Sequence, residues 1–153
     1  MANSPMCSMA GAEAALTALC AELNVNNAHL GILKVFSGAL PATCETADPS
    51  GALSTGCTFA STAFTTTDGG ANGLATGTAG TIAADSSVAS GGTALCFRAY
   101  NAGSNGSTLV CHLQGTVGTS GCDMNLNTTT LVTGATFTIT AFVVTLADGS
   151  GAD

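Results

Sequence analysis

The sequence contains very little charge, and positive charge is the scarcer kind. Of its 153 residues only 7% are charged, whereas about 25% is usual for a soluble domain. Lys34 and Arg98 are the only strong bases against nine carboxylates, so the formal net charge is −7. Binding to nucleic-acid phosphates or to an anionic membrane surface depends on clusters of Lys and Arg. The composition therefore excludes nucleic acid and membrane as partners.

Long apolar runs are also missing. The longest candidate, Phe137–Ala147, is interrupted by three threonines and is far shorter than the roughly 20 residues that a transmembrane helix needs. The N-terminal stretch has no Lys or Arg and carries acids at Glu13 and Glu22, which is untypical of a secretory signal. We expect a protein that begins near Met1 and is synthesised in the cytoplasm.

Residues for nucleophilic catalysis or zinc binding are few. The histidines are His29 and His112, and the sequence contains neither a GxSxG motif nor a CxxC motif. A Cys–His pair is conceivable because Cys111 precedes His112, but no protease signature accompanies it. We therefore expect no enzyme, no cofactor and no metal.

One short stretch opens like a calcium-binding loop. Asp123, Asn125 and Asn127 follow the D-x-N-x-N pattern, but Thr128 and Gly134 stand where such a loop needs Gly and Glu. In a strand, alternate residues point to the same face. We therefore expect Asp123, Asn125 and Asn127 to form a polar row on one face of a strand.

The seven cysteines allow two interpretations. They lie at positions 7, 20, 44, 57, 96, 111 and 122. Cys96 and Cys111 flank the turn segment Asn101–Gly106 almost symmetrically, so a hairpin there would place them opposite each other as a candidate disulfide. Alternatively, all seven are small buried apolar residues, as synthesis in a reducing compartment favours.

The chain opens with a polar segment that precedes a helix. The first eight residues are polar and contain Pro and Ser, and we expect residues 1–11 to form a flexible N-terminal arm. Leu16, Leu19, Cys20 and Leu23 recur at the spacing of one helical face among several alanines, which predicts a helix over residues 12–23. Its apolar face packs either on the rest of the chain or on a partner.

The remainder is typical of β-structure. Branched and aromatic segments separated by Gly and Asn predict seven or eight short strands. They are Leu30–Ser37, Cys57–Thr65, part of Ala71–Ile82, Thr93–Tyr100, Ser107–Thr116, Met124–Leu131 and Ala135–Leu146. In the last, apolar residues alternate with threonines and both faces become apolar from Ala141, as in a sandwich interior. We expect an all-β fold, an antiparallel β-sandwich or jelly-roll-like domain over residues 12–148 with one short N-terminal helix, and a tail over 149–153.

Three segments resemble a family of small proteins encoded among the virion structural genes of tailed phages. They are Leu30–Ala42, Gly92–Arg98 (GTALCFR, similar to the family's GTAxxFR) and Gly115–Thr129, followed by Gly134–Thr145. The resemblance covers most of Leu23–Leu146. The chain departs from the family pattern at Cys96, Cys111 and Cys122, which stand where ordinary apolar, aromatic or small residues are expected.

The resemblance implies a capsid decoration (cement) protein that binds the major capsid protein and stabilises the shell. We expect it on the capsid surface of the virion, after synthesis in the host bacterial cytoplasm, as a homo-oligomer with a trimer favoured over a dimer. A low-charge face of Thr, Ala and Gly can pack over a neighbouring subunit at little desolvation cost. The candidate capsid contacts in the arm are Ala2, Asn3, Ser4, Pro5 and Met6.

The alternative function is a tail- or fibre-associated module that binds glycans on the host surface. Glycan binders usually offer exposed aromatic rings for stacking. This chain has no Trp and a single Tyr, Tyr100, which disfavours the alternative.

Overall fold

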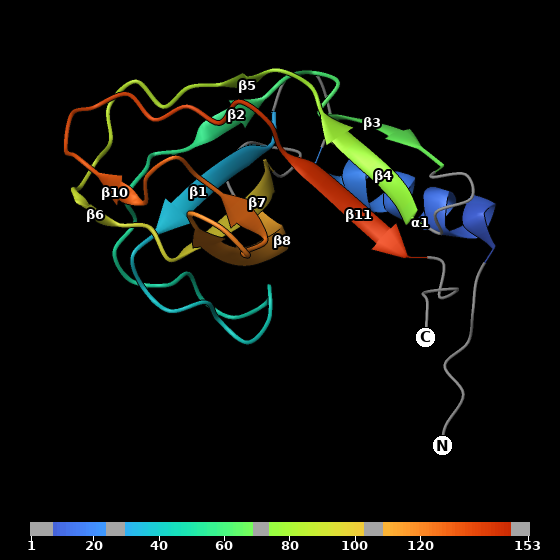
Figure 1. Ribbon diagram of the computed structural model, residues 1–153, viewed down its shortest axis with the longest axis horizontal. Helices are drawn as coiled ribbons and strands as arrows, with labels where there is room; N and C mark the ends of the chain where they lie inside the picture. The colour runs from blue at the N-terminus through green and yellow to red at the C-terminus, as the bar shows by residue number, and fades with distance from the viewer. Residues whose placement is uncertain (1–7, 24–29, 69–73, 103–108, 148–153) are drawn as a thin grey trace.

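The computed structural model describes residues 8–23, 30–68, 74–102 and 109–147. Within these ranges the chain forms one helix and eleven short strands (Figure 1). They are α1 (Met9–Glu22), β1 (Ile32–Phe36), β2 (Cys57–Phe59), β3 (Phe64–Thr67), β4 (Leu74–Ala79), β5 (Ile82–Ala83), β6 (Gly92–Thr93), β7 (Cys96–Ala102), β8 (Leu109–Gly118), β9 (Met124–Asn125), β10 (Thr130–Leu131) and β11 (Val143–Ala147). The predicted fold class, mostly β with one short N-terminal helix, is confirmed.

The strands form three sheets. The largest has the order β5-β2-β1-β7-β8-β9, and a smaller one has the order β11-β4-β3. A two-stranded sheet pairs β10 with β6. All pairs are antiparallel except β8 with β9. Figure 1 shows the three-stranded sheet and α1 at one end of the molecule and the two-stranded sheet at the other, so the two ends carry different surfaces.

The helix begins earlier than the sequence predicts. The Ser8 hydroxyl accepts a hydrogen bond from the Gly11 N–H at 3.1 Å and caps a helix that starts at Met9. Such a cap satisfies one of the free N–H groups of the first turn. The prediction of an arm over residues 1–11 is therefore wrong at its C-terminal end. Residues 1–7, with the candidate contacts Ala2–Met6, lie outside the described residues.

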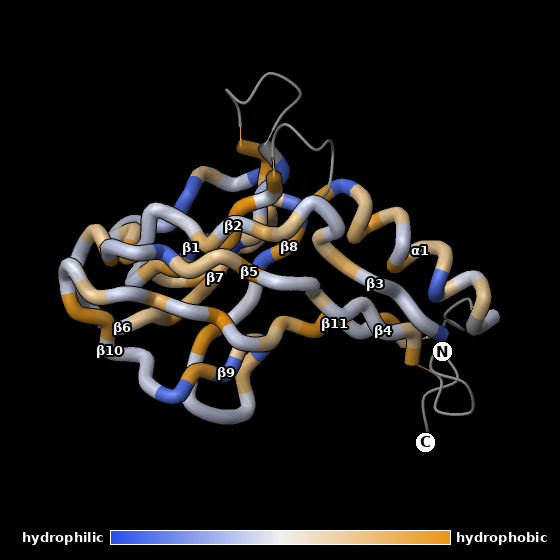
Figure 2. The backbone as a smooth tube through the Cα atoms, turned by 90° about the horizontal axis from the view of Figure 1, so that it is seen from above, coloured by the Kyte–Doolittle hydropathy of each residue, from blue (hydrophilic) through white to orange (hydrophobic). Residues whose placement is uncertain are grey.

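The apolar face of α1 packs on the protein itself. Leu16 and Cys20 are buried against Ala75 of β4, and Phe64 and Val144 pack beside them. Seen from above, α1 runs alongside β3, and strongly hydrophilic stretches of the chain are few and short (Figure 2). Of the two possibilities left open for this helical face, the structure selects packing against the helix's own domain.

An aromatic cluster joins the two larger sheets in one core. The ring of Phe142, just before β11, lies 5.4 Å from that of Phe97 on β7 and 6.3 Å from that of Phe59 on β2, measured between centroids. Phe64 on β3 lies 5.4 Å from Phe59 and 6.0 Å from Phe142. Such tilted and edge-on arrangements are favourable for aromatic pairs. The cluster therefore sets the position of the three-stranded sheet relative to the six-stranded sheet.

The predicted strand Ala135–Leu146 is wrong in its first half. Phe137 and Ile139 are buried at alternate positions, as predicted, but this part makes only a single bridge, from Phe137 to Asp85, and the strand begins at Val143. Alternation reports which side chains face the core, whereas a strand also needs a continuous ladder with its neighbour, and here the long-range backbone bonds reach only Asp85 and Val88. The expected burial of both faces is wrong too, since Val143 is 48% exposed on an edge strand.

The predicted hairpin is confirmed, but its register separates the two cysteines of the candidate disulfide. Cys96 lies opposite Thr116, and Cys111 lies opposite Tyr100. The ladder is centred later in the chain than the midpoint of the two cysteines, and it shifts by one residue at His112 on β8. Both thiols are free. The geometric reasoning for a Cys96–Cys111 disulfide is therefore wrong, because symmetric spacing around a turn does not fix the register.

Candidate functional site

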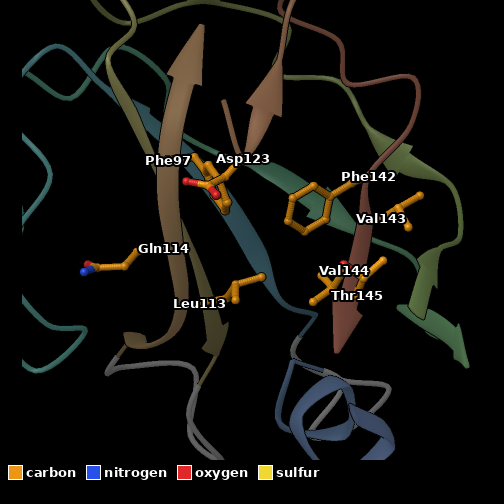
Figure 3. Close-up of a pocket in the computed structure, with 8 residues that line it drawn as sticks. All are labelled: Phe97, Leu113, Gln114, Asp123, Phe142, Val143, Val144 and Thr145. Atoms are coloured by element: carbon orange, nitrogen blue, oxygen red, sulfur yellow. The ribbon is translucent and has the colours of Figure 1, made fainter. Parts of the chain in front are cut away.

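A groove of about 290 Å³ lies between β8 and the edge strand β11 (Figure 3). Phe97, Leu113 and Phe142 make its apolar floor, and Asp123 lies at the side of β8. The complete lining is Phe97, Leu113, Gln114, Asp123, Phe142, Val143, Val144 and Thr145. Pockets for small molecules usually span about 300–1,000 Å³. The groove therefore lies at the lower limit of that range.

Backbone edges form the walls of the groove. Four consecutive residues, 142–145, line one side, so the groove meets the edge of the strand rather than one of its faces. Within the described residues, β11 pairs only with β4, and β8 pairs on this side only at Val117 and Gly118, with β9. Both walls therefore present unpaired backbone groups, a template for a further strand.

The register identifies which backbone groups point into the groove. The Ala79 N–H donates to the Phe142 carbonyl at 2.9 Å. Hydrogen-bonded and non-hydrogen-bonded pairs alternate along an antiparallel ladder. The N–H groups of Val144 and Leu146 therefore face β4, whereas those of Val143 and Thr145 face the open edge.

Asp123 closes part of the opposite wall. Its carboxylate accepts hydrogen bonds from the Thr116 N–H and hydroxyl, each at 2.8 Å. These two bonds hold the pKa of Asp123 below its usual value. Gly115 makes room for this arrangement, since a Cβ there would lie 2.7 Å from Cε1 of Phe97 and 2.8 Å from Cβ of Asp123. At the β8 edge, the backbone N–H of Thr116 is thus already bonded to Asp123, whereas the described edge further along has no such cap.

The polar row predicted around Asp123 is confirmed for the burial pattern. Asp123, Asn125 and Asn127 are exposed, while Met124 between them is buried. The Asn125 amide oxygen accepts a hydrogen bond from the Cys122 N–H at 3.2 Å. Asp123 and Asn125 are therefore each directed at a nearby backbone N–H.

An uncharged face of the three-stranded sheet adjoins the groove. Its ladder places Thr65 opposite Thr78, Thr67 opposite Thr76, and Thr76 opposite Thr145. We define the threonine face as Thr65, Thr67, Leu74, Thr76, Thr78, Val143, Thr145 and Ala147, all exposed except for the half-buried Thr76. Strand residues alternate between faces, and α1 covers the other one. Since Val143 and Thr145 also line the groove, the two form one continuous surface.

A buried polar cluster occupies the opposite face of the six-stranded sheet. Whereas Phe97 faces the groove, its neighbour Arg98 faces away and its side chain is only 1% exposed. It donates five hydrogen bonds, at 2.7–3.1 Å, to Gln114 Oε1, to the carbonyls of Thr43, Cys44 and Thr46, and to Asp48 Oδ1. Its five N–H donors are thereby engaged. This side chain holds the loop between Ser37 and Gly51 against β7 and β8, and Gln114 adds a hydrogen bond from its Nε2 to the Pro41 carbonyl at 2.8 Å.

Tyr100 and Asp48 complete the cluster. The Tyr100 hydroxyl donates to the same Asp48 oxygen at 2.6 Å. Burial alone would raise the pKa of Asp48, but the hydrogen bonds from Tyr100 and Arg98 outweigh it and hold the pKa below its ordinary value. The ammonium of Lys34 lies 5.6 Å from the centre of the Tyr100 ring. Both strong bases of the chain thus serve one internal cluster, which sequence reasoning missed; the only signal was that Arg98 belongs to the family-like GTALCFR segment.

The structure does not bring a Cys–His pair together in the described residues. The Cys111 thiol donates to the Leu113 carbonyl at 3.4 Å rather than to His112. His112 is the extra residue of the β8 bulge, and its Nε2 is buried without a hydrogen-bond partner among the described atoms. His29 lies outside the described residues.

The chain matches no known family profile, no curated protein and no solved structure. The resemblance to tailed-phage virion proteins therefore rests on the sequence segments Leu30–Ala42, Gly92–Arg98, Gly115–Thr129 and Gly134–Thr145. In the part of the chain that the structure describes, no helix has both the length and the apolarity to cross a membrane.

Proposed function

We propose that this chain is a phage capsid decoration protein, located on the virion surface, that binds the major capsid protein through the threonine face and the adjoining groove. The observation that carries the proposal is this continuous surface, which combines uncharged side chains with an open strand edge. It is the kind of low-charge face that the resemblance leads us to expect.

The charge distribution supports a protein partner. Arg98 is buried and Lys34 is half-buried against Tyr100, so the exposed charges of the described residues are acidic. An uncharged sheet face loses little hydration energy on burial, because hydroxyls exchange hydrogen bonds more cheaply than charges do. The surrounding acidic surface favours a partner that carries neutral or basic side chains around the contact.

The groove supports a specific occupant, an extended segment of the major capsid protein. Such a segment would add a strand to the open edge, with backbone hydrogen bonds to the free groups of Val143 and Thr145. Its alternate side chains would rest on Phe97, Leu113 and Phe142. Many such contacts on a symmetric shell strengthen binding by avidity.

We further propose that the two larger sheets are the layers of a β-sandwich related to the jelly roll. The shared aromatic core around Phe142 supports this arrangement. We also propose that the protein acts as a homo-oligomer, a trimer rather than a dimer, which light scattering of the purified protein would measure.

The first test is the copy number of the protein in purified virions, measured by quantitative mass spectrometry against the major capsid protein. Decoration predicts a copy number comparable to that of the major capsid protein or a fixed, sizeable fraction of it. A handful of copies would instead support the tail- or fibre-associated alternative, and absence from particles would overturn both.

The second test places a charge on the proposed contact. Thr78→Lys puts an ammonium on the threonine face, whereas Thr130→Lys puts the same charge on exposed β10, at the opposite end of the molecule (Figure 1). Undecorated capsids should bind the Thr78 variant at least about 10-fold more weakly than the wild type, because an ammonium would be buried without a partner. The Thr130 variant should bind normally; equal binding by both variants would remove the threonine face from the interface.

A further inference from the structure

Two cysteines from distant parts of the sequence meet beside the buried polar cluster. Cys44 lies in the loop between Ser37 and Gly51, and Cys111 lies on β8. Both line one pocket of about 350 Å³, together with Asp48, Arg98 and Tyr100. After burial, the neighbouring Cys44 thiol is the next cause that raises the pKa of the Cys111 thiol, so the two thiols lie close together in this pocket. The thiols of Cys57, Cys96 and Cys111 each donate to a carbonyl oxygen, but Cys44 and Cys111 are the two described cysteines that line a pocket together.

The backbone on both sides of this contact is held in place. The Cys44 carbonyl accepts a hydrogen bond from Arg98 at 3.1 Å, and the flanking Thr43 and Thr46 carbonyls accept bonds from the same guanidinium at 2.9 and 3.0 Å. Cys111 is fixed by its strand pairing with Tyr100. Because both segments are already held beside each other, the two sulfurs would not have to diffuse together before a covalent bond forms between them.

We propose that Cys44 and Cys111 form a disulfide when the protein leaves the reducing cytoplasm. The bond would lock the loop between Ser37 and Gly51 onto β8, in addition to the Arg98 hydrogen bonds. In the cytoplasm the two residues remain thiols. This inference does not depend on the capsid proposal, because it rests on the shared pocket and on the bonds that hold the two segments beside it.

The chemistry needs an oxidant, and a small-molecule disulfide such as oxidised glutathione is sufficient. The Cys44 thiolate attacks one sulfur of glutathione disulfide, which gives a mixed disulfide and releases one glutathione thiolate that takes up a proton. The Cys111 thiolate then attacks the Cys44 sulfur and releases the second glutathione. Two protein thiols are oxidised and one glutathione disulfide is reduced to two glutathione molecules. Burial raises the pKa of the Cys111 thiol, so we expect the second step to be the slower one.

The test uses the full-length protein, fully reduced and then equilibrated with oxidised glutathione. Free thiols are alkylated, and peptides from Asp-N or chymotrypsin are mapped without reduction, since two basic residues give few tryptic sites. The expected result is a peptide pair joined through Cys44 and Cys111, absent from the reduced sample. Alkylation of both residues after oxidation, or a bond from Cys111 to Cys96, would overturn the proposal.

A thermal measurement gives an independent check. Closing a loop from residue 44 to residue 111 should raise the melting temperature of the oxidised protein over the reduced protein by roughly 5–15 °C. Cys44→Ser and Cys111→Ser should each abolish the difference, and the double variant should lose no more than either. Cys122→Ser is the matched control, since this half-buried thiol lies in a turn beside Gly118, and it should keep the full difference. A difference that survives in Cys44→Ser would assign the stabilisation to another pair.

Discussion

The two faces of β7 and β8 support neighbouring structure in different ways. On one face Arg98 holds the loop between Ser37 and Gly51 through directional hydrogen bonds and an ion pair with Asp48 at 2.7 Å. On the other face, Phe97 holds the three-stranded sheet through an aromatic contact with Phe142. Directional polar contacts fix one arrangement and leave costly unpaired groups when broken, whereas apolar contacts weaken in proportion to the area lost.

The difference bears on where binding occurs. On the polar face, every N–H donor of Arg98 already bonds to a group within the protein, so few donors remain for a ligand. The apolar side ends in an unpaired strand edge next to an uncharged face. We therefore expect the binding surface on the apolar side, where fewer hydrogen-bonding groups are already paired within the protein.

A large loss of stability is expected from Arg98→Met. The change removes five hydrogen bonds and leaves the carbonyls of Thr43 and Thr46 without their donor. We expect a loss of about 3 kcal/mol in the free energy of unfolding; breaking a fully buried ion pair costs about 3–5 kcal/mol, but Asp48 is 49% exposed and would be partly rehydrated. Urea denaturation measures this.

Lys34→Met is the control for Arg98→Met. Lys34 lies opposite Arg98 in the ladder and makes a cation–π contact with Tyr100. Its removal should cost less than about 1 kcal/mol. Equal losses from the two variants would mean that net charge, not the hydrogen-bond cluster, governs this face.

The apolar side is tested by Leu16→Ala in α1. Leu16 is fully buried against β4, and truncating such a residue costs about 2–5 kcal/mol. We expect about 2–3 kcal/mol, because α1 has only one covered face and can shift towards the space created. Leu19→Ala, at a half-buried position of the same helix, should cost about 1 kcal/mol. Thermal unfolding followed by circular dichroism would show whether that ranking is reversed.

Sequence patterns predicted the apolar side of the protein better than the polar side. The spacing of Leu16, Cys20 and Leu23 predicts the buried face of α1, because helical periodicity translates directly into burial. The hairpin of β7 and β8 was predicted because two β-rich segments flank the turn segment Asn101–Gly106. Neither pattern contains the pairing partners, so the open edge of β11 and the register that separates Cys96 from Cys111 were not predictable.

The polar cluster was invisible in the sequence for a different reason. Its members Thr43, Asp48, Arg98 and Gln114 are far apart in the chain and meet only in the folded protein. An Asp in a loop often caps its own backbone, but Asp48 accepts a hydrogen bond from Arg98 instead. Asp85 follows the local rule, since its carboxylate accepts a bond from the Ser87 N–H.

A smaller, pH-dependent effect is expected from Asp85→Asn. The buried carboxylate accepts hydrogen bonds from the N–H groups of Thr55 at 2.7 Å and Ser87 at 3.1 Å. Burial alone would raise the pKa of Asp85, but these backbone donors outweigh it and hold the pKa below its ordinary value. Substitution should cost about 1–2 kcal/mol at pH 7.

The sign of the pH effect follows from this lowered pKa. Because the folded state holds the proton less tightly than the unfolded state, the stabilisation is fully present above the unfolded value of about 4 and is lost as the pH falls through the lower folded value. Chemical denaturation from pH 5 to pH 2 should show a shallower decline for Asp85→Asn than for the wild type. Parallel declines would assign the acid sensitivity to the other carboxyl groups with lowered pKa values, which are Glu45, Asp48 and Asp123.

The smallest effect on stability is expected from Thr145→Pro, which tests the open edge itself. The Thr145 N–H points away from β4, so a proline removes no ladder hydrogen bond, and prolines are tolerated on such edges. We expect a loss below about 1 kcal/mol, whereas Leu146→Pro, one residue along, removes an N–H that faces β4 and should cost about 3 kcal/mol. If the groove takes up a strand, Thr145→Pro should nevertheless reduce binding to undecorated capsids by at least about 10-fold, because the incoming backbone loses a donor and meets the proline ring. Normal binding by this variant, with its fold intact, would exclude strand addition at β11 and leave the threonine face as the proposed contact.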